Sequence, residues 1–321
     1  MARVLGWKER QEREDQAIIL APQEQYNAHM SDATFSRRQA LTLAAGVAGA
    51  MATGAKLPDM SEQKPKRSLK QSVCRWCFGG IELDALCVAA KGMGLVGIDL
   101  LAESEFATVK KHGLICTMAL GITTIADGWN RVENHDRFVK DAERLIPIIA
   151  ENGFKNAITF SGNRAGMADA TGMDNCAKGL ERIMKTCDKY GVTIHMELLN
   201  SKRMHKDYMC DHTDWGVGLC KKVGSDKFKL LYDIFHMQIM EGDLCDMIRE
   251  NITYIGHFHT GGVPGRHEID SGQEINYPRV CKTILETGFE GYFAHEFIPE
   301  RDALTSLREA VNLCRIVTEG R

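Results

Sequence analysis

The feature that most constrains the fold is a regular alternation along residues 71–321. Short apolar runs rich in β-branched and aromatic residues alternate with segments of helical periodicity, and Gly or Asn often stands where the two meet. Eight strands are predicted, at residues 73–78, 95–101, 114–120, 157–161, 193–199, 229–235, 254–259 and 292–297. The clearest predicted helices between and after them are at residues 134–152, 173–190, 213–223, 244–251, 277–287 and 303–318.

This pattern predicts an α/β fold, a (β/α)₈ TIM barrel, because eight strand-then-helix units in about 250 residues match its size and order. The alternative is an open, doubly wound sheet. That fold would call for a Gly-rich phosphate-binding turn after the first strand, and Phe78-Gly79-Gly80-Ile81 lacks the GxGxxG pattern. In a barrel, functional residues gather at the C-terminal ends of the strands, so we expect polar residues that end strands to converge.

Composition excludes several classes of protein. The chain is 44% hydrophobic and 26% charged, which is typical of a soluble protein with one large core. Its net charge is −3, without the basic excess that binding to phosphate backbones needs, so no nucleic-acid partner is expected. The 11 cysteines are irregularly spaced and are expected to be small core residues. Cys74 and Cys77 have CxxC spacing, but on a strand they would point to opposite faces, so neither a zinc nor a redox role follows.

The N-terminal part is a different kind of sequence. Residues 1–29 are polar and irregular and are expected to be a disordered extension or a mis-assigned start, with Met30 as the true one. Residues 30–55 contain Arg37 and Arg38 before a weakly hydrophobic, Ala/Gly-rich run too short to span a bilayer. This arrangement resembles a twin-arginine export signal.

The predicted signal ends near Ala50-Met51-Ala52, a small-x-small cleavage site, and residues 56–70 have the charged, Pro-containing composition of a linker. The barrel domain is therefore predicted at residues 71–321. The expected location is the periplasm or another exported compartment reached through the twin-arginine machinery, or the cytoplasm if the signal is not used. No integral membrane segment is expected in the mature chain.

Four successive predicted strands end in a carboxylate or an imidazole. These residues are Glu197, Asp233, His259 and Glu296. A single buried acid is usually a satisfied core carboxylate, but three unpaired ones cannot share a barrel interior unless a cation compensates them. Three oxygens and one nitrogen without a thiolate favour one Mg²⁺ or Mn²⁺ ion as the cofactor, with Co²⁺ or Zn²⁺ as alternatives.

Two further residues are candidates for binding substrate beside this cluster. His236 follows Asp233 by three positions, where it could orient that carboxylate or touch the substrate. Arg266 lies in a Gly/Pro-rich loop after the seventh strand, where its guanidinium could clamp a carboxylate, a phosphate or a sugar hydroxyl. The alternative for Arg266 is an ordinary loop arginine paired with Glu268.

Four other positions carry weaker expectations. Arg164, after the fourth strand, is a candidate of the same kind as Arg266, and Trp76 could line the pocket as an apolar wall for a sugar, although core packing is the alternative. His257 and His295 are expected to face the helices and to be structural.

The sequence also resembles the xylose isomerase-like barrel superfamily, and within it the hydroxypyruvate isomerase-like proteins. The likeness covers essentially residues 72–321. It is carried by Met196-Glu197-Leu-Leu-Asn200, Tyr232-Asp233-Ile-Phe-His236, Gly256-His-Phe-His259, Val263-Pro-Gly-Arg266-His-Glu268, Gly272-Gln-Glu274-Ile-Asn-Tyr277, and Gly291-Tyr292 with Glu296.

The resemblance implies that Glu197, Asp233, His259 and Glu296 bind one divalent metal ion and that the two glutamates also serve as acid and base. Hydroxypyruvate isomerases commonly carry Gln where His259 stands, whereas His there is similar to the ketose 3-epimerases, so the substrate stays open.

The function expected from these observations is a divalent-metal-dependent sugar isomerase of the hydroxypyruvate isomerase-like kind. It would interconvert a small hydroxy-aldehyde and ketone, with one of the two glutamates removing the proton and the other returning it. The alternatives are a keto-sugar 3-epimerase or a keto-inositol dehydratase on the same scaffold, or a non-catalytic, exported carbohydrate-binding barrel. The oligomeric state stays open, a homo-oligomer included.

Overall fold

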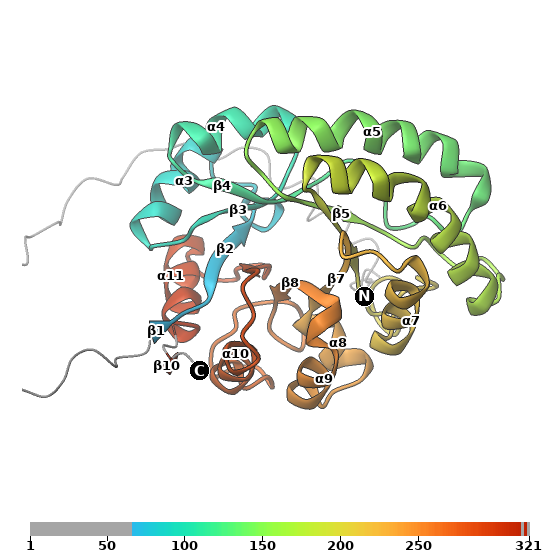
Figure 1. Ribbon diagram of the computed structural model, residues 1–321. Helices are drawn as coiled ribbons and strands as arrows, with labels where there is room; N and C mark the ends of the chain where they lie inside the picture. Colours follow the sequence, from blue (N-terminus) through green and yellow to red (C-terminus); the bar gives the residue numbers. More distant parts are fainter. Residues whose placement is uncertain (1–65, 316–317, 320–321) are drawn as a thin grey trace, which may run out of the picture. The chain divides into compact units, whose positions relative to one another are not determined.

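A computed structural model describes residues 66–315 and 318–319 of the chain. Eight parallel strands close into a barrel in sequence order, and helices surround it, which confirms the predicted (β/α)₈ fold (Figure 1). The barrel strands are β2 (Lys70–Cys74), β3 (Gly97–Leu101), β4 (Ile115–Ala119), β5 (Asn156–Thr159), β6 (Thr193–Glu197), β7 (Phe228–Asp233), β8 (Ile255–Thr260) and β9 (Tyr292–His295).

The helices follow the strands in the expected order. They are α3 (Leu83–Gly92), α4 (Phe106–Lys111), α5 (His135–Glu151), α6 (Asp169–Tyr190), α7 (Thr213–Val223), α8 (Ile234–Met240), α9 (Leu244–Asn251), α10 (Tyr277–Glu286) and α11 (Ala303–Leu313). Two of them, α6 and α7, end at Gly191 and Gly224, which adopt the left-handed conformation with φ of 69° and 64°. Glycine takes this conformation without the steric cost that a Cβ atom adds.

Several predicted strand ends differ from the structure, and two of these differences bear on functional side chains. The first strand ends at Cys74 rather than at residue 78, and a short 3₁₀ helix, η2 (Trp76–Phe78), follows it. The sixth ends at Asp233, because the side chain of Asp233 accepts a hydrogen bond from the backbone N–H of His236 and so caps α8. Both differences place functional side chains in the short helices that follow the strands, Trp76 in η2 and His236 in α8.

The predicted extension, export signal and most of the linker lie outside the described residues, and export stays a prediction. The end of the predicted linker is structured, because β1 (Lys66–Arg67) pairs in antiparallel fashion with β10 (Thr318–Glu319). Among the described residues, no helix has both the length and the hydropathy that crossing a bilayer requires. The described cysteines are free thiols and most are buried, as expected for small core residues.

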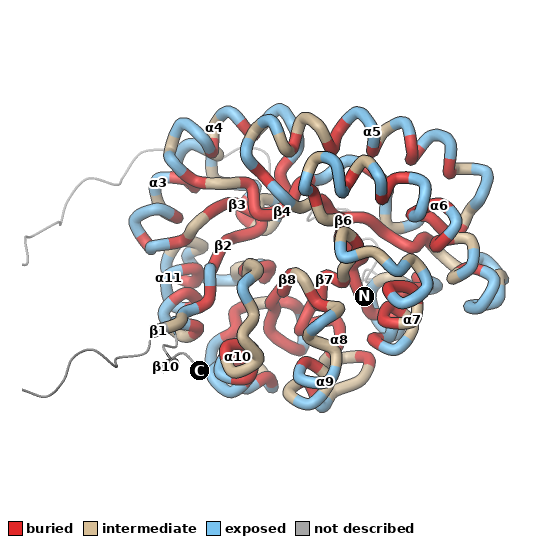
Figure 2. Tube along the Cα trace, viewed as in Figure 1, coloured by how far each residue is buried: buried red, intermediate tan, exposed pale blue. Residues whose placement is uncertain are grey.

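Buried residues follow the strands and the inward faces of the helices, whereas exposed ones line the outside (Figure 2). The apolar core lies mainly between strands and helices. Inside the barrel, toward the C-terminal strand ends, buried polar side chains take over, among them Asp99, Glu197, Asp233 and His259. The fold therefore concentrates its buried charge where barrel proteins carry function.

Gly179 provides a test of how closely α6 packs on the neighbouring layer. A Cβ atom there would lie 2.5 Å from Cε3 of buried Trp129. In a helix interior, alanine is about 1 kcal/mol more favourable than glycine. We nevertheless expect Gly179→Ala to lower the free energy of unfolding by about 1–3 kcal/mol, because the new Cβ atom would clash with a rigid ring.

The control is Gly218→Ala in α7, where the new Cβ would lie 3.1 Å from Cε of Met173, the end of a flexible side chain. We expect this variant to be neutral or slightly stabilised in chemical unfolding. Equal effects of the two substitutions would contradict the packing argument.

Candidate active site

Four predicted residues meet at the C-terminal end of the barrel. Glu197 ends β6, Asp233 ends β7, His259 lies near the end of β8, and Glu296 follows β9 directly. Each offers one ligand atom, these atoms all lie within 4.8 Å of one another, and all four residues are buried. We call these four residues the carboxylate cluster.

Two positive groups compensate the acids. His259 Nδ1 lies 2.6 Å from Glu296 Oε2 and 3.3 Å from Glu197 Oε1. Arg266 Nη2 lies 2.6 Å from Asp233 Oδ2 and also donates to Glu296 Oε2. Arg266 is itself only 2% exposed, so these are charge-assisted contacts inside the protein rather than on its surface.

The two glutamates differ in their electrostatic surroundings. Burial raises the pKa of Glu197 above its usual range, and the charge of Glu296 adds to this effect. Burial also opposes ionisation of Glu296, but the charges of Arg266 and His259 outweigh it and lower the pKa of that carboxyl. A pair of acids whose pKa values are driven apart in this way is typical of acid–base catalysis.

The chemistry of the donor set fits a divalent cation. Three carboxylate oxygens and one imidazole nitrogen converge without a thiolate, the type of set that Mg²⁺ and Mn²⁺ accept. The acids already need positive charge, which Arg266 and His259 supply. The cluster residues are thus able to hold one divalent metal ion.

The loop between β8 and α10 carries Arg266 into the cluster. Arg266 adopts a left-handed conformation with φ of 64°. Its N–H donates to Gly262 O and its carbonyl accepts from Ile298 N, so its backbone is held at both sides. These contacts aim the guanidinium inward, toward Asp233 and Glu296.

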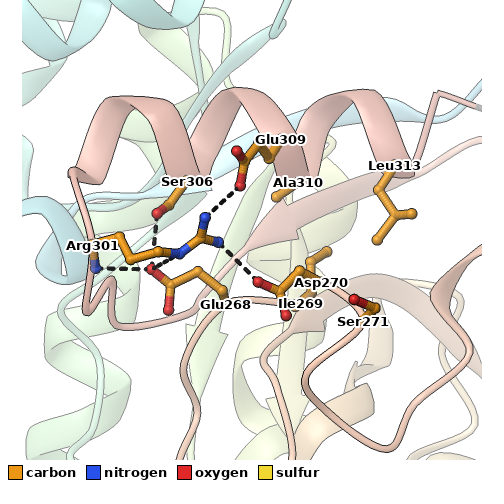
Figure 3. A pocket seen from close by; sticks show the side chains of 9 residues that line it. All are labelled: Glu268, Ile269, Asp270, Ser271, Arg301, Ser306, Glu309, Ala310 and Leu313. Atoms are coloured by element: carbon orange, nitrogen blue, oxygen red, sulfur yellow. Dashed lines mark hydrogen bonds and ion pairs between the residues drawn. The ribbon is translucent and has the colours of Figure 1, made fainter.

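The alternative pairing of Arg266 with Glu268 is wrong. Glu268 Oε1 instead accepts from Ser306 Oγ at 2.8 Å and from the backbone N–H of Arg301 at 3.1 Å (Figure 3). Arg301 also reaches Asp270 and Glu309 beside a cavity along α11. Glu268 therefore anchors the loop to α11 and leaves Arg266 to the cluster.

His236, in α8, contacts Arg266 next to the carboxylate cluster. Its Nε2 is 3.0 Å from Arg266 Nη1, and its Nδ1 accepts from the backbone N–H of Asn200 at 3.1 Å. Burial, followed by the charge of Arg266, keeps the pKa of His236 well below its usual range. The neutral ring orients Arg266, and the backbone N–H of the same residue holds Asp233.

Trp76 stands at the mouth of the barrel. It lies in η2 and is 49% exposed, so it is not a core residue. Its indole Nε1 donates to Glu296 Oε1 at 2.6 Å. An exposed ring bonded to a cluster residue is well placed to contact a substrate.

Arg164 is not brought to the cluster. It pairs with Asp169 at 2.6 Å and with Asp211 at 3.0 Å, and it donates to the carbonyl oxygens of Tyr208 and Met209. These bonds join the loops that follow β5 and β6. A structural role explains all of its contacts in the described part of the chain.

The sequence analysis placed His257 on the wrong face of its strand and did not identify Asp99 as a site residue. His257 faces the barrel interior, 3.0 Å from Asp99 Oδ2, and the expectation that it faces the helices is wrong, because residues two apart on a strand share a face. His295 does face the helices, where it contacts Gln71. The signal for Asp99 was available, because it interrupts the apolar run of β3 as Glu197 interrupts that of β6.

Fold and site together define a (β/α)₈ barrel with a buried carboxylate–imidazole cluster at its C-terminal end. The model of the xylose isomerase-like TIM barrel family matches residues 98–316, and the chain belongs to this family.

Among curated relatives, the chain is 38% identical over 109 residues to 2-oxo-tetronate isomerase of Cupriavidus necator, which is 34% of this chain and 41% of that protein. It is 36% identical over 96 residues to hydroxypyruvate isomerase of Escherichia coli, which is 30% of this chain and 37% of that protein. The matched part thus spans about two fifths of these relatives.

Solved structures with the same fold include an AP endonuclease of family 2 from Brucella melitensis, with a TM-score of 0.67 at 20% identity, over 74% of this chain and 96% of that one. Another is 3-keto-D-glucoside 4-epimerase from E. coli, with a TM-score of 0.64 at 18% identity, over 76% of this chain and 98% of that one. At these identities the likeness concerns the fold alone.

Arg266→Gln tests the charge balance of the cluster. Without the guanidinium, Asp233 and Glu296 lose a buried partner, and we expect the metal-free protein to lose about 3–5 kcal/mol of stability. Adding Mn²⁺ should then raise Tm more than it does in the unaltered protein, because the guanidinium no longer competes with the ion for Asp233 and Glu296.

The control is Arg301→Gln, which removes an exposed arginine that also pairs with several acids. We expect a small loss of stability and an unaltered response to Mn²⁺. Similar behaviour of the two variants in thermal unfolding would contradict the role given to Arg266.

Proposed function

We propose that this protein is a divalent-metal-dependent isomerase that interconverts a small hydroxy-aldehyde and hydroxy-ketone. The observation that carries the proposal is the buried cluster of Glu197, Asp233, His259 and Glu296. Family membership supports an isomerase or epimerase, because both curated relatives named above are isomerases.

The substrate class follows from the relatives and from charge. 2-Oxo-tetronate and hydroxypyruvate, named for those relatives, are small hydroxy-keto acids. Arg266 is a buried guanidinium in the site, with a fork geometry that suits a carboxylate. We therefore propose a short 2-oxo acid with a neighbouring hydroxyl group as the substrate.

The four cluster residues would hold one divalent cation. When bound, such an ion supplies electrostatic stabilisation of negative charge that develops on adjacent substrate oxygens. Asp233 and His259 act only as holders in this scheme. Trp76 and Arg266 both bond to Glu296, so they fix the carboxylate that faces the mouth of the barrel.

Proton transfer is assigned to the two glutamates. One removes the proton from the carbon that bears the hydroxyl group, which leaves an enediolate, and the other returns a proton to the neighbouring carbon. The hydroxyl proton passes from the first oxygen to the second, so that the old hydroxyl becomes the carbonyl. Glu296 is held at both oxygens, by Trp76 at Oε1 and by Arg266 and His259 at Oε2. Glu197 has His259 as its side-chain partner at Oε1, so its second oxygen is available to a substrate.

The test is solvent exchange in D₂O, in the presence of Mn²⁺, with hydroxypyruvate and, in parallel, with a panel of ketoses. The unaltered protein should incorporate deuterium and form the isomeric aldehyde. Glu197→Gln and Glu296→Gln should each lower the rate about 100-fold or more, because each removes a group that carries the proton.

Glu241→Gln is the matched control, because Glu241 caps α7 through Thr213 and is not in the cluster. It should keep the unaltered rate. Release of water from the substrate would indicate a dehydratase, and inversion at carbon 3 of a ketose would indicate an epimerase. Ligand binding without turnover would indicate a carbohydrate-binding barrel; each of these results would overturn the isomerase proposal.

A further inference from the structure

A second polar group lies inside the barrel beside the carboxylate cluster. Asp99, on β3, is fully buried, and with His257 and His259 it forms a compact group whose polar atoms lie within 4.8 Å of one another. The reaction proposed above uses His259 but neither Asp99 nor His257. Burying a carboxylate costs free energy unless charged or hydrogen-bonding partners compensate it.

Asp99 contacts the side chains of Cys74, Thr117, His257 and His259. Asp99 Oδ1 lies 3.0 Å from His259 Nε2, and Oδ2 accepts from Thr117 Oγ1 at 2.5 Å. His257 Nε2 lies 3.0 Å from the same Oδ2. The thiol of Cys74 is 3.8 Å from His259 Nε2, and sulfur is a weak hydrogen-bonding group. Asp99 is thus the strong acceptor that the described structure places at Nε2.

The backbone around Asp99 is irregular. The register between β3 and β4 shifts on both sides of Asp99, and Leu100 adopts a left-handed φ of 56°. For a residue with a large side chain this conformation costs free energy and is retained where surrounding structure or function demands it. A strand irregularity of this kind re-aims the neighbouring side chain.

We propose that Asp99 is a positioning residue for the metal site. By accepting the Nε2–H of His259, it fixes the ring so that Nδ1 faces Glu197 and Glu296, 3.3 and 2.6 Å away. Partners of this kind orient histidine ligands and raise their basicity. The inference rests on the proposed function, because it assigns Nδ1 of His259 to the cation.

Asp99→Asn keeps the shape of the side chain but offers one acceptor oxygen where aspartate offers two. Either His257 or His259 then meets an amide N–H₂ instead of an oxygen. We expect Co²⁺ to bind the metal-free variant about 10–100-fold more weakly than the unaltered protein, with a changed visible spectrum of the bound ion. The measurement is a Co²⁺ titration followed by absorbance and calorimetry.

The matched control is Gln71→Met, which removes a buried amide on the helix-facing side of β2, where it bonds to His295 and to Val311. It should lower the Tm of the metal-free protein without weakening Co²⁺ binding. Thr117→Val is a milder second variant, because it removes the hydroxyl that holds Asp99 Oδ2. It should weaken Co²⁺ binding several-fold and serves if Asp99→Asn does not fold.

The outcomes separate the two proposals. If the unaltered protein does not bind Co²⁺, the proposed metal-dependent function fails, and the role of Asp99 fails with it. If the unaltered protein binds Co²⁺ and Asp99→Asn or Thr117→Val binds it equally well, only the role of Asp99 is overturned. Weaker binding in these variants but not in Gln71→Met supports the proposal.

Discussion

The structure depends on how buried negative charge is compensated at one end of the barrel. Glu197, Asp233 and Glu296 all lie in the protein interior. Removing three carboxylates from water would cost several kcal/mol each without compensation. The guanidinium of Arg266 and the imidazole of His259 supply positive charge in direct contact with them. Such an arrangement is costly for stability alone, and the metal-dependent function proposed above would account for it.

The fold provides this arrangement through small local devices. The parallel register aligns Asp233 of β7 with His259 of β8, so their side chains emerge next to each other. In the first turn of α8, the backbone N–H of His236 donates a hydrogen bond to the side chain of Asp233. The loop after β8 is tied to α11 through Glu268, which leaves Arg266 free to enter the cluster. Each device lies at a strand end, where the backbone leaves the sheet.

Much of this could be predicted from the sequence. The alternation of strands and helices gives the barrel, and the acids that interrupt apolar runs give Glu197, Asp233 and Glu296. The pattern does not contain the direction that a loop side chain takes or the exact alignment of neighbouring strands. The inward course of Arg266 depends on a left-handed backbone and on loop contacts. Asp99 interrupts an apolar run as the other acids do, but its position beside His259 depends on a strand irregularity. The exposure of Trp76 depends on a strand that ends early, at Cys74.

The central claim is that the cluster holds one divalent cation. The most direct measurement is a crystal structure of the protein grown with Mn²⁺, with anomalous scattering used to locate the ion. The account predicts a single strong peak among Glu197, Asp233, His259 and Glu296, with the guanidinium of Arg266 moved away from Asp233. A cluster without a peak, in crystals of a protein saturated with Mn²⁺, would contradict it.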